Sequence, residues 1–533
     1  MKVTLTGLAV VLVLVVATGC GGGSSSTTKG SGSTVPTSHA APAPKPGGSL
    51  TVLEGAGFAG DWPAGLDPAT NTNGAADQSQ MIAIYGQLFE LTPGGKLQPD
   101  LASGYQYKNG GKTVIIKIRP GVKFSDGTPF DAEAVVFNWK RDLASPCTCK
   151  PIWPVKSITA PDSHTVQVDL QAPDGALINQ LQDANVNWIA SPTALKKTGE
   201  QAFKLKPVGA GPFTVVSNRL SSQLVLKKNP SYWKQGRPYL DQLTFKTTSN
   251  DETALEAMQA GEAQAYEGVS TPTLVKSFDK RFTVTKMPST SPYNIQLNTA
   301  IPPFNNKQAR LAIYYATDVK LIDEKLFGNQ YPLVQSFTAP GGLFFNPSVS
   351  SYPSYDLNKA KSIVKSLGAL KVNFFTLQTP TNTNFMEALQ TMWKQAGINA
   401  SIHLYSLAGL IQQFQTKKWQ AALQTAGAWD PAGGVGVAFR FQSQSPFSGV
   451  QDKKLDGMLA QGTASVNPSQ RKAVYDQAGN YIAQQAYSPF LFPIATWNIA
   501  NGAWGPGLTT AIPSVAVNPA VLWQEVYRGG TSS

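Results

Sequence analysis

Few side chains in this sequence have the types and spacing that catalysis requires. Ser231 and Lys234 in SYWK show the S-x-x-K spacing, in which a lysine can take the proton of a serine nucleophile, and a KTG tripeptide stands at 197–199. The S-D-N that would complete this set is absent, as are G-x-S-x-G and H-E-x-x-H. His164 and His403 fall in a predicted turn and a predicted strand. The sequence therefore indicates a protein that is not an enzyme, and a secreted hydrolase is the weakest alternative.

Cys147 and Cys149 stand in a C-x-C pattern. A disulfide between them would close a very small, strained ring, and a soft-metal site would need further ligands, which are not evident nearby. A structural pair, bridged or free, is favoured, and a redox or metal-binding pair stays open. With three histidines in the whole chain, we expect no metal and no cofactor.

Trp429 and Asp430, in QTAGAWDPAGG, are suited to binding rather than catalysis. The indole could pack against a ligand, and the carboxylate could hold a positively charged group. The alternative is a buried turn, because tryptophan is more often part of a core and Asp-Pro favours turn formation.

The N-terminal residues predict export. Residues 1–20, MKVTLTGLAVVLVLVVATGC, combine a basic start, a short apolar run and small residues before Cys20, as a secretory signal does. ATGC resembles the lipobox of bacterial lipoproteins, so we expect Cys20 to carry a lipid; ordinary cleavage with Cys20 incidental is the alternative. Residues 21–47 are rich in Gly, Ser and Pro and are expected to form a flexible tether.

The composition limits the possible partners. The chain has 44 Lys+Arg against 32 Asp+Glu, a formal net charge of +12, but the basic residues are scattered in short groups. Nucleic acid is therefore not an expected partner, and the basic residues are interpreted as part of a solvated surface. Residues 48–533 are numerous enough for two or three lobes with their own cores.

Strand patterns dominate the first part of the body and helix patterns the later part. Residues 121–141, GVKFSDGTPFDAEAVVFNWKR, predict a strand, a turn and a helix that Asp131 caps. Strands are also predicted at 48–54 and 163–170. Amphipathic helices are predicted at 306–328 and 383–398, with strands around them, which favours an α/β lobe with a largely parallel sheet in this later part of the body.

Several motifs resemble those of the family 5 extracellular solute-binding proteins, the oligopeptide-, dipeptide- and nickel-binding receptors of ABC importers. They occur in the family's order: LQPDLASGYQYKNGGKTVIIKIRPGVKFSDGTPFDAEAVV, KPVGAGPF, NPSYW, ALEAMQAGEAQAY and NIQLNTAIPPFNNKQARLAIYYATD. Tyr105 replaces the family's tryptophan, and Ala134 replaces an aspartate. The resemblance covers nearly the whole body and implies that residues 121–141 are scaffold.

The resemblance implies a two-lobed α/β clamshell of the periplasmic-binding-protein-like II fold, with an extra domain inserted in lobe I. The expected division is lobe I at 48–87, 204–290 and 491–533, the extra domain at 88–203, and lobe II at 291–490. Two crossing strands are expected near STSPYNIQ and YSPFLFP. Closure of the lobes around a ligand would exclude water and strengthen polar contacts.

The implied function is capture of a small solute, with an oligopeptide or dipeptide as the default, for an ABC permease and its ATPase. The protein is expected to be a monomer outside the cytoplasm, lipid-anchored to the cell membrane. In peptide receptors of the family an aspartate in W-x-A-D-Y holds the ligand's amino group, and Asp430-Pro431 does not keep that spacing. A non-peptide ligand such as a glycoside, an opine or a metal chelate is therefore the alternative. The expected ligand-binding residues are Trp429, Asp430, Gly427, Trp497, Asn498, Tyr293, Asn294, Glu54, Phe58 and Trp62.

Overall fold

The structure is a computed structural model that describes residues 41–55, 64–71, 77–145, 151, 153–269, 271–278, 281–427, 429–434, 436–513 and 520–529. Everything below refers to the unit formed by residues 41–533. The expectations for residues 1–20, Cys20, Phe58, Trp62, Cys147 and Cys149 lie outside the described residues. Within the described ranges, no helix is both long enough and apolar enough to cross a bilayer.

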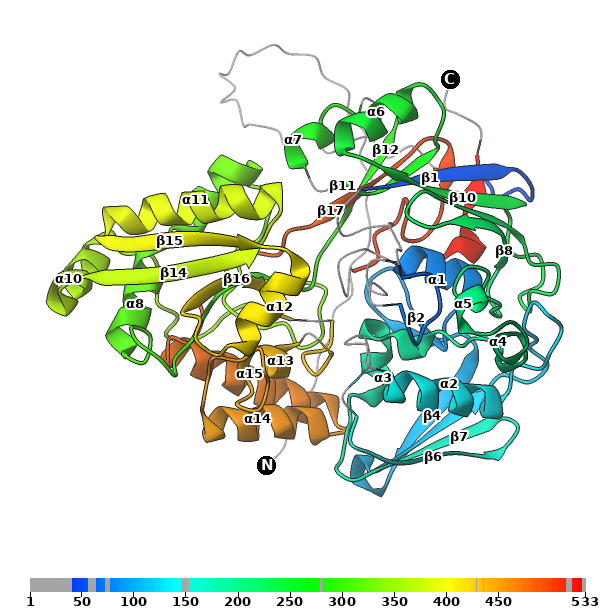
Figure 1. The fold of residues 1–533 in the computed structure, drawn as a ribbon, viewed down its shortest axis with the longest axis horizontal. Helices are drawn as coiled ribbons and strands as arrows, with labels where there is room; N and C mark the ends of the chain where they lie inside the picture. Colours follow the sequence, from blue (N-terminus) through cyan, green and yellow to red (C-terminus); the bar gives the residue numbers. More distant parts are fainter. Residues whose placement is uncertain are drawn as a thin grey trace, which may run out of the picture. The chain divides into compact units, whose positions relative to one another are not determined.

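A seven-stranded mixed sheet gathers segments from distant parts of the chain (Figure 1). Its central strand β1 is parallel to both neighbours, β10 and β11, and the other pairs are antiparallel. The spatial order is β12 (Thr283–Met287), β17 (Thr496–Ala500), β11 (Ala265–Val269), β1 (Ser49–Gly55), β10 (Gln242–Thr248), β9 (Gln223–Lys228) and β8 (Phe213–Arg219).

One face of this sheet packs on helix α1 (Gln78–Tyr85). Leu50 and Val52 of β1 belong to the same buried cluster as Met81 of the helix and Trp523 near the C-terminus. Because alternate residues of a strand share a face, Glu54 also lies on this side of β1. Helix α6 (Asp251–Gln259) is capped by Asn250, as predicted, and its Met258 is buried in a different cluster, together with Leu53 of β1.

A second, antiparallel sheet has the order β4-β5-β7-β6 and is covered by helix α2 (Ala132–Ala144). Its strands are β4 (Ala102–Lys108), β5 (Thr113–Ile118), β7 (Thr165–Leu170) and β6 (Val155–Asp162). The predicted cap is confirmed, because the Asp131 carboxylate accepts from the Ala134 N–H at 2.9 Å. Val135 and Trp139 are fully buried, so α2 is a packing helix. A short hairpin, β2 (Phe89–Leu91) with β3 (Leu97–Pro99), precedes this sheet.

The predicted strand at the start of 121–141 is wrong. Only an isolated bridge joins Lys123 to Pro129. Turns at Gly121 and Gly127, both with positive φ, leave too few residues between them for a strand ladder.

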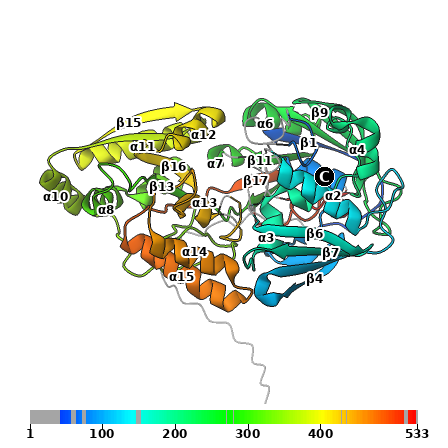
Figure 2. The same ribbon diagram turned by 60° about the horizontal axis from the view of Figure 1, so that its bottom comes forward.

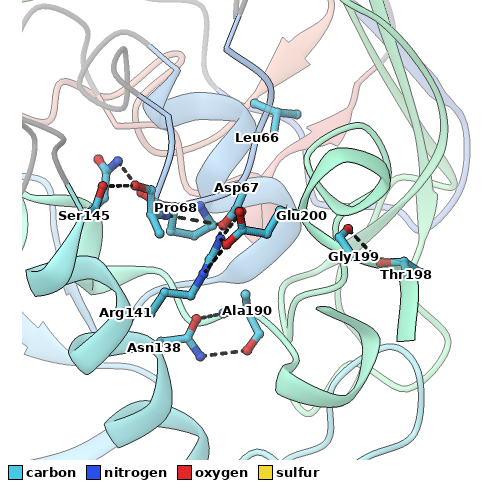
Figure 3. Close-up of polar contacts among 12 residues, drawn as sticks. Leu66, Asp67, Pro68, Asn138, Arg141, Ser145, Ala190, Thr198, Gly199 and Glu200 are labelled. Carbon is cyan, nitrogen blue, oxygen red and sulfur yellow. Dashed lines mark hydrogen bonds and ion pairs between the residues drawn. The ribbon is translucent and has the colours of Figure 1, made fainter. Parts of the chain in front are cut away.

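The last turn of α2 ties the helix to the turn at residues 66–68 (Figure 3). The Arg141 guanidinium donates to both oxygens of the fully buried Asp67, at 2.6 and 2.5 Å, and to Glu200 at 3.0 Å. Ser145 donates to the carbonyl of Ala69. Arg141, the charged residue at the end of the 121–141 segment, therefore stabilises the packing of α2 against the turn at residues 66–68.

A third sheet, with the order β13-β16-β14-β15, is parallel in two of its three pairings. Its strands are β13 (Tyr293–Leu297), β16 (Ala421–Thr425), β14 (Leu370–Leu377) and β15 (Ile398–Tyr405). Helices α8 (Lys307–Ala316), α10 (Leu357–Leu367) and α11 (Pro380–Gln395) accompany it (Figure 1). The prediction of a single helix over 306–328 is wrong, because the segment is divided into shorter helices. Thr317 has extended backbone, and the Asp318 carboxylate caps a new short helix, α9 (Val319–Ile322), which runs into a π-helical turn at Asp323–Phe327.

Further helices complete the described fold. They are α3 (Leu177–Gln180), α4 (Pro192–Thr198), α5 (Glu200–Phe203), α7 (Pro272–Val275), α12 (Leu407–Gln415), α13 (Val437–Phe441), α14 (Lys453–Ala464) and α15 (Pro468–Gln484). Residues 489–492 run antiparallel to the start of β13, with hydrogen bonds of 2.9–3.0 Å that link Tyr293 to Leu491 and Phe492, and Ile295 to Pro489. These are the two segments expected to cross between lobes; the exact lobe boundaries stay predictions.

Candidate ligand-binding site

Asp430 is fully buried and faces Arg471 of α15. The guanidinium donates to both carboxylate oxygens, at 2.6 and 2.8 Å, and the amide of Asn179 in α3 adds a third bond at 2.7 Å. The backbone N–H of Ala432 donates to the same carboxylate at 2.9 Å. Burial by itself lowers the pKa of Arg471, but the facing carboxylate outweighs it and leaves the pKa above its usual value. These contacts favour the buried-turn interpretation of Asp430 over that of a free charge anchor.

Trp429 is 2% exposed and belongs to the buried cluster that contains Val52 of β1. The loop that follows β16 therefore contributes to the hydrophobic cluster that also covers one face of the seven-stranded sheet. The indole Nε1 has no hydrogen-bond partner among the described residues, and the same is true of the Nε1 atoms of Trp188, Trp233, Trp419 and Trp504. A buried N–H without an acceptor is costly, so such a donor gains from any acceptor that reaches it.

Near Asp430, the part of the chain that carries the small antiparallel sheet meets helices α14 and α15. These two helices lie side by side in Figures 1 and 2. The N–H of Gly175 donates to the carbonyl of Thr463 at 2.8 Å, and a Cβ on Gly175 would stand 1.9 Å from the carbonyl oxygen of Ser465. The two carboxylate oxygens of Asp183 are enclosed here without a partner in the described chain. Burial, and then the charge of Asp430, raises the pKa of Asp183 well above its usual range.

Glu54 lies at the carboxyl end of β1, opposite Glu267 of β11 in the parallel register. Both are 1% exposed. Gln80 of α1 donates through Nε2 to both Glu54 oxygens, one at 2.6 Å, and Ser79 donates to Glu267 at 2.6 Å. Burial, then the charges of Glu267 and Asp77, raises the pKa of Glu54, and burial raises the pKa of Glu267 to about 8. This is a buried, acceptor-rich group of side chains.

Tyr293 and Asn294 begin β13. The Tyr293 hydroxyl donates to Asn382 at 3.0 Å, and burial raises the pKa of Tyr293 to about 12. Asn294 is fully buried and donates to the hydroxyl of Ser488 at 2.7 Å, while its Oδ1 has no partner among the residues described. Asn294 therefore joins the two segments that run antiparallel here.

Gly427 and the two β17 residues are occupied by packing and backbone contacts. Gly427 has φ +129°, and a Cβ there would lie 2.2 Å from the carbonyl oxygen of Phe337. Trp497 is 5% exposed and packs in the cluster that holds Leu53. Asn498 donates to the carbonyl of Gly507 at 2.7 Å and accepts from the N–H of Gly268 at 3.0 Å. These arrangements are what core or strand-crossing residues show.

The predicted residues thus fall into separate places. Glu54 lies on the side of β1 whose buried cluster includes Trp429, whereas Trp497 belongs to the cluster on the opposite side of that sheet. Sequence reasoning missed Arg471, Asp183 and Glu267. Arg471 and Asp183 had no motif to mark them, whereas Glu267 directly follows the noted segment ALEAMQAGEAQAY, in a strand beside β1.

A cavity of about 170 Å³ lies elsewhere, beside residues 489–491. It is lined by aromatic and polar side chains that include Tyr314, Lys320, Tyr352 and Tyr355. No predicted site residue lines it. Among the residues described, no group of three His, Cys, Asp or Glu side chains could hold a metal ion.

Comparison with known families decides what these elements belong to. Residues 96–446, more than half of the chain, match the family profile of the bacterial extracellular solute-binding proteins, family 5. The chain belongs to this family. Its members act outside the cytoplasm, and its matched relatives are solute-binding proteins rather than enzymes.

Relatives of family 5 resemble the chain in sequence and in fold. The glutathione-binding protein GsiB of Shigella flexneri is 28% identical over 444 residues, which cover 79% of this chain and 85% of that protein. The dipeptide-binding protein of Pseudoalteromonas sp. SM9913, solved with Met-Leu, has a TM-score of 0.74 at 20% identity and covers 90% of this chain and 100% of its own. The protein MoaA of A. tumefaciens, solved with mannopinic acid, has a TM-score of 0.73 at 21% identity and covers 91% and 100%. The predicted α/β fold of the two-lobed periplasmic binding proteins is confirmed.

Proposed function

We propose that this protein captures a small peptide-type solute outside the cytoplasm and delivers it to the permease and ATPase of an ABC importer. The observation that carries the proposal is the family 5 match over residues 96–446. The relatives named for glutathione and for a dipeptide support a peptide-type ligand. Both ligands are short, flexible molecules with a charged amino group and at least one charged carboxylate.

A second ligand class has its own support. MoaA, solved with mannopinic acid, shares the fold at a similar TM-score, and the family's W-x-A-D-Y spacing is missing here. Asp430, the nearest carboxylate, is already paired with Arg471. An opine-like ligand is therefore the second candidate, and the two classes share a charged nitrogen and a carboxylate.

The proposed binding region lies between lobe I (48–87, 204–290 and 491–533) and lobe II (291–490), with the extra domain (88–203) beside it. Of the predicted residues, Glu54 and Trp429 have the best support. Glu54 lies on the side of β1 whose buried cluster includes Trp429, and the Trp429 Nε1 has no partner among the described residues. The remaining predicted contacts are retained as proposals with less support from their surroundings: Asp430, Gly427, Trp497, Asn498, Tyr293, Asn294, Phe58 and Trp62.

The receptor is proposed to act near the membrane as a monomer without catalytic activity. A lipid on Cys20 and a tether of residues 21–47 would hold the binding unit close to the permease. Such a tether raises the effective concentration of the receptor at its partner, by an amount that depends on tether length and stiffness.

Native mass spectrometry of the purified protein tests the proposed function. Co-purified masses spaced by amino-acid residues, or calorimetric binding of glutathione or Met-Leu, are the expected results. Binding of mannopinic acid alone would support the second ligand class. A protein that binds none of these compounds and turns over a peptide or an ester would refute the proposal.

A further inference from the structure

Within the described part of the chain, the pair formed by Glu54 and Glu267 has no counter-charge, and the charge of a third acidic residue, Asp77, also raises the pKa of Glu54. The two residues occupy matched positions on parallel strands β1 and β11, and both are 1% exposed. Among the ion pairs of the described residues none includes either glutamate. Two ionised carboxylates side by side in a buried place repel each other, so the empty protein keeps a proton on the pair.

The side chains around the pair leave acceptors without donors. Glu267 Oε1 and Gln80 Oε1 are both buried without a partner in the described part of the chain. Gln80 is fully buried, and its Nε2 donates to Glu54, so its carbonyl oxygen, on the same amide, lies at the edge of the pair. An ammonium group offers three donors and no acceptor, which complements such a set.

The position of the pair suits a ligand site. Parallel strands β1 and β11 end at the same edge of the sheet, and Glu54 and Glu267 stand one and two residues before those ends. In open α/β sheets, ligands bind outside the carboxyl ends of the strands. By strand alternation, both glutamates share the face of Val52 and Ala265, whose buried cluster includes Trp429 from the third sheet's loop.

We propose that Glu54 and Glu267 form the subsite that receives the positively charged amino group of the ligand, and that the proton on the pair leaves for solvent as the ammonium arrives. The step conserves charge: the ligand brings one positive charge, the pair becomes doubly ionised, and one proton is released. This inference rests on the proposed function, and it supplies the amino-group anchor that the paired Asp430 does not.

Isothermal titration calorimetry tests the inference. Met-Leu and glutathione are titrated at pH 6.5 in phosphate and in imidazole, and the difference between the binding enthalpies gives the number of protons released. The native protein is expected to release close to one proton per ligand, because burial raises the pKa of Glu267 to about 8. The probe N-acetyl-Met-Leu, which lacks the ammonium, is expected to bind more weakly and to release no proton.

Glu54→Gln and Glu267→Gln are the test variants, and exposed Glu262→Gln is the control. Each test variant is expected to lose affinity for Met-Leu by about 10- to 100-fold, the range for a charge-assisted hydrogen bond. Glu267→Gln should release fewer protons than the native protein, because it removes one of the two carboxyls whose pKa is raised, and the affinity for N-acetyl-Met-Leu should stay as in the native protein. Thermal unfolding checks the fold, and Glu267→Gln should melt no lower than the native protein, since an amide replaces a carboxyl that is mostly neutral.

Two results would overturn the inference in distinguishable ways. If the native protein binds Met-Leu or glutathione and both test variants bind equally well without a change in proton release, the pair is structural and the inference alone fails. If the native protein binds no probe, the proposed function fails and the inference falls with it.

Discussion

Removing the Arg471 guanidinium isolates a buried carboxylate. In Arg471→Met, an apolar side chain of similar length replaces the group that donates to both oxygens of Asp430. Asp430 would keep Asn179 and the N–H of Ala432 as donors but would lose its only ion-pair partner among the described residues. The variant also loses the contact of the guanidinium with the ring of Phe344, 4.9 Å away.

The expected cost follows from the burial of both partners, whose side chains are 3% and 0% exposed. Breaking such a pair by removing one member costs about 3–5 kcal/mol. At an unfolding entropy of about 2.1 cal/mol/K per residue, a cooperative unit from 41 to 533 loses roughly 1 °C for each kcal/mol. The melting temperature of Arg471→Met should therefore fall by about 3–5 °C.

Differential scanning calorimetry of a double-mutant cycle is the assay. Asp430→Asn alone should also destabilise the protein, because it leaves the guanidinium buried without a counter-charge. The double variant should lose less stability than the two single variants added together, with a coupling free energy of about 2 kcal/mol or more. Exposed Arg219→Met is the control and should stay within about 0.5 kcal/mol of native. Additive losses, or a single-variant change below 1 °C, would refute the reasoning that the pair neutralises Asp430.

Three further outcomes are expected. Asp183→Asn should raise the melting temperature at pH 7 and change it little at pH 4. Because the pKa of Asp183 is raised, the folded protein holds this proton to a higher pH than the unfolded chain does, and native stability falls as the pH rises above the pKa of the unfolded chain. Equal effects at both pH values would contradict this reasoning. Gly175→Ala should lower the melting temperature and increase the radius of gyration in X-ray scattering, because its methyl group would meet the carbonyl of Ser465, whereas Gly104→Ala, with open space around it, should do neither. Cys20→Ser should move the protein from the detergent phase to the aqueous phase in Triton X-114 partitioning of cell extracts; unchanged partitioning would argue against a lipid on Cys20.

Local patterns predicted much of the fold. The strand at β1, the capped helix α2 and the capped helix α6 were all marked by residues within a few positions of one another. The failures have local causes too. The segment 306–328 has one amphipathic pattern, but Asp318 satisfies the first N–H groups of a new helix better than it continues the old one.

The candidate site was predicted less well, since it depends on contacts between distant residues. Trp429 was proposed from its neighbours in sequence, and Glu54 from the family resemblance; both stay predictions. Arg471 stands 41 residues from Asp430, and Asn179 stands 251 residues from it. No local pattern states which of the many arginines and asparagines meets that carboxylate.

By itself, the sequence determined the α/β class, the capped helices and the family, because hydrophobic periodicity, capping and motif order are recorded in neighbouring residues. Only the tertiary structure decided which charges are neutralised. Asp430 is paired with a guanidinium, whereas Glu54 and Glu267 lie beside each other with only neutral donors, Gln80 and Ser79, among the described residues. The physical reason is that the charge state of a buried group depends on desolvation and on partners that the folded chain brings from far away.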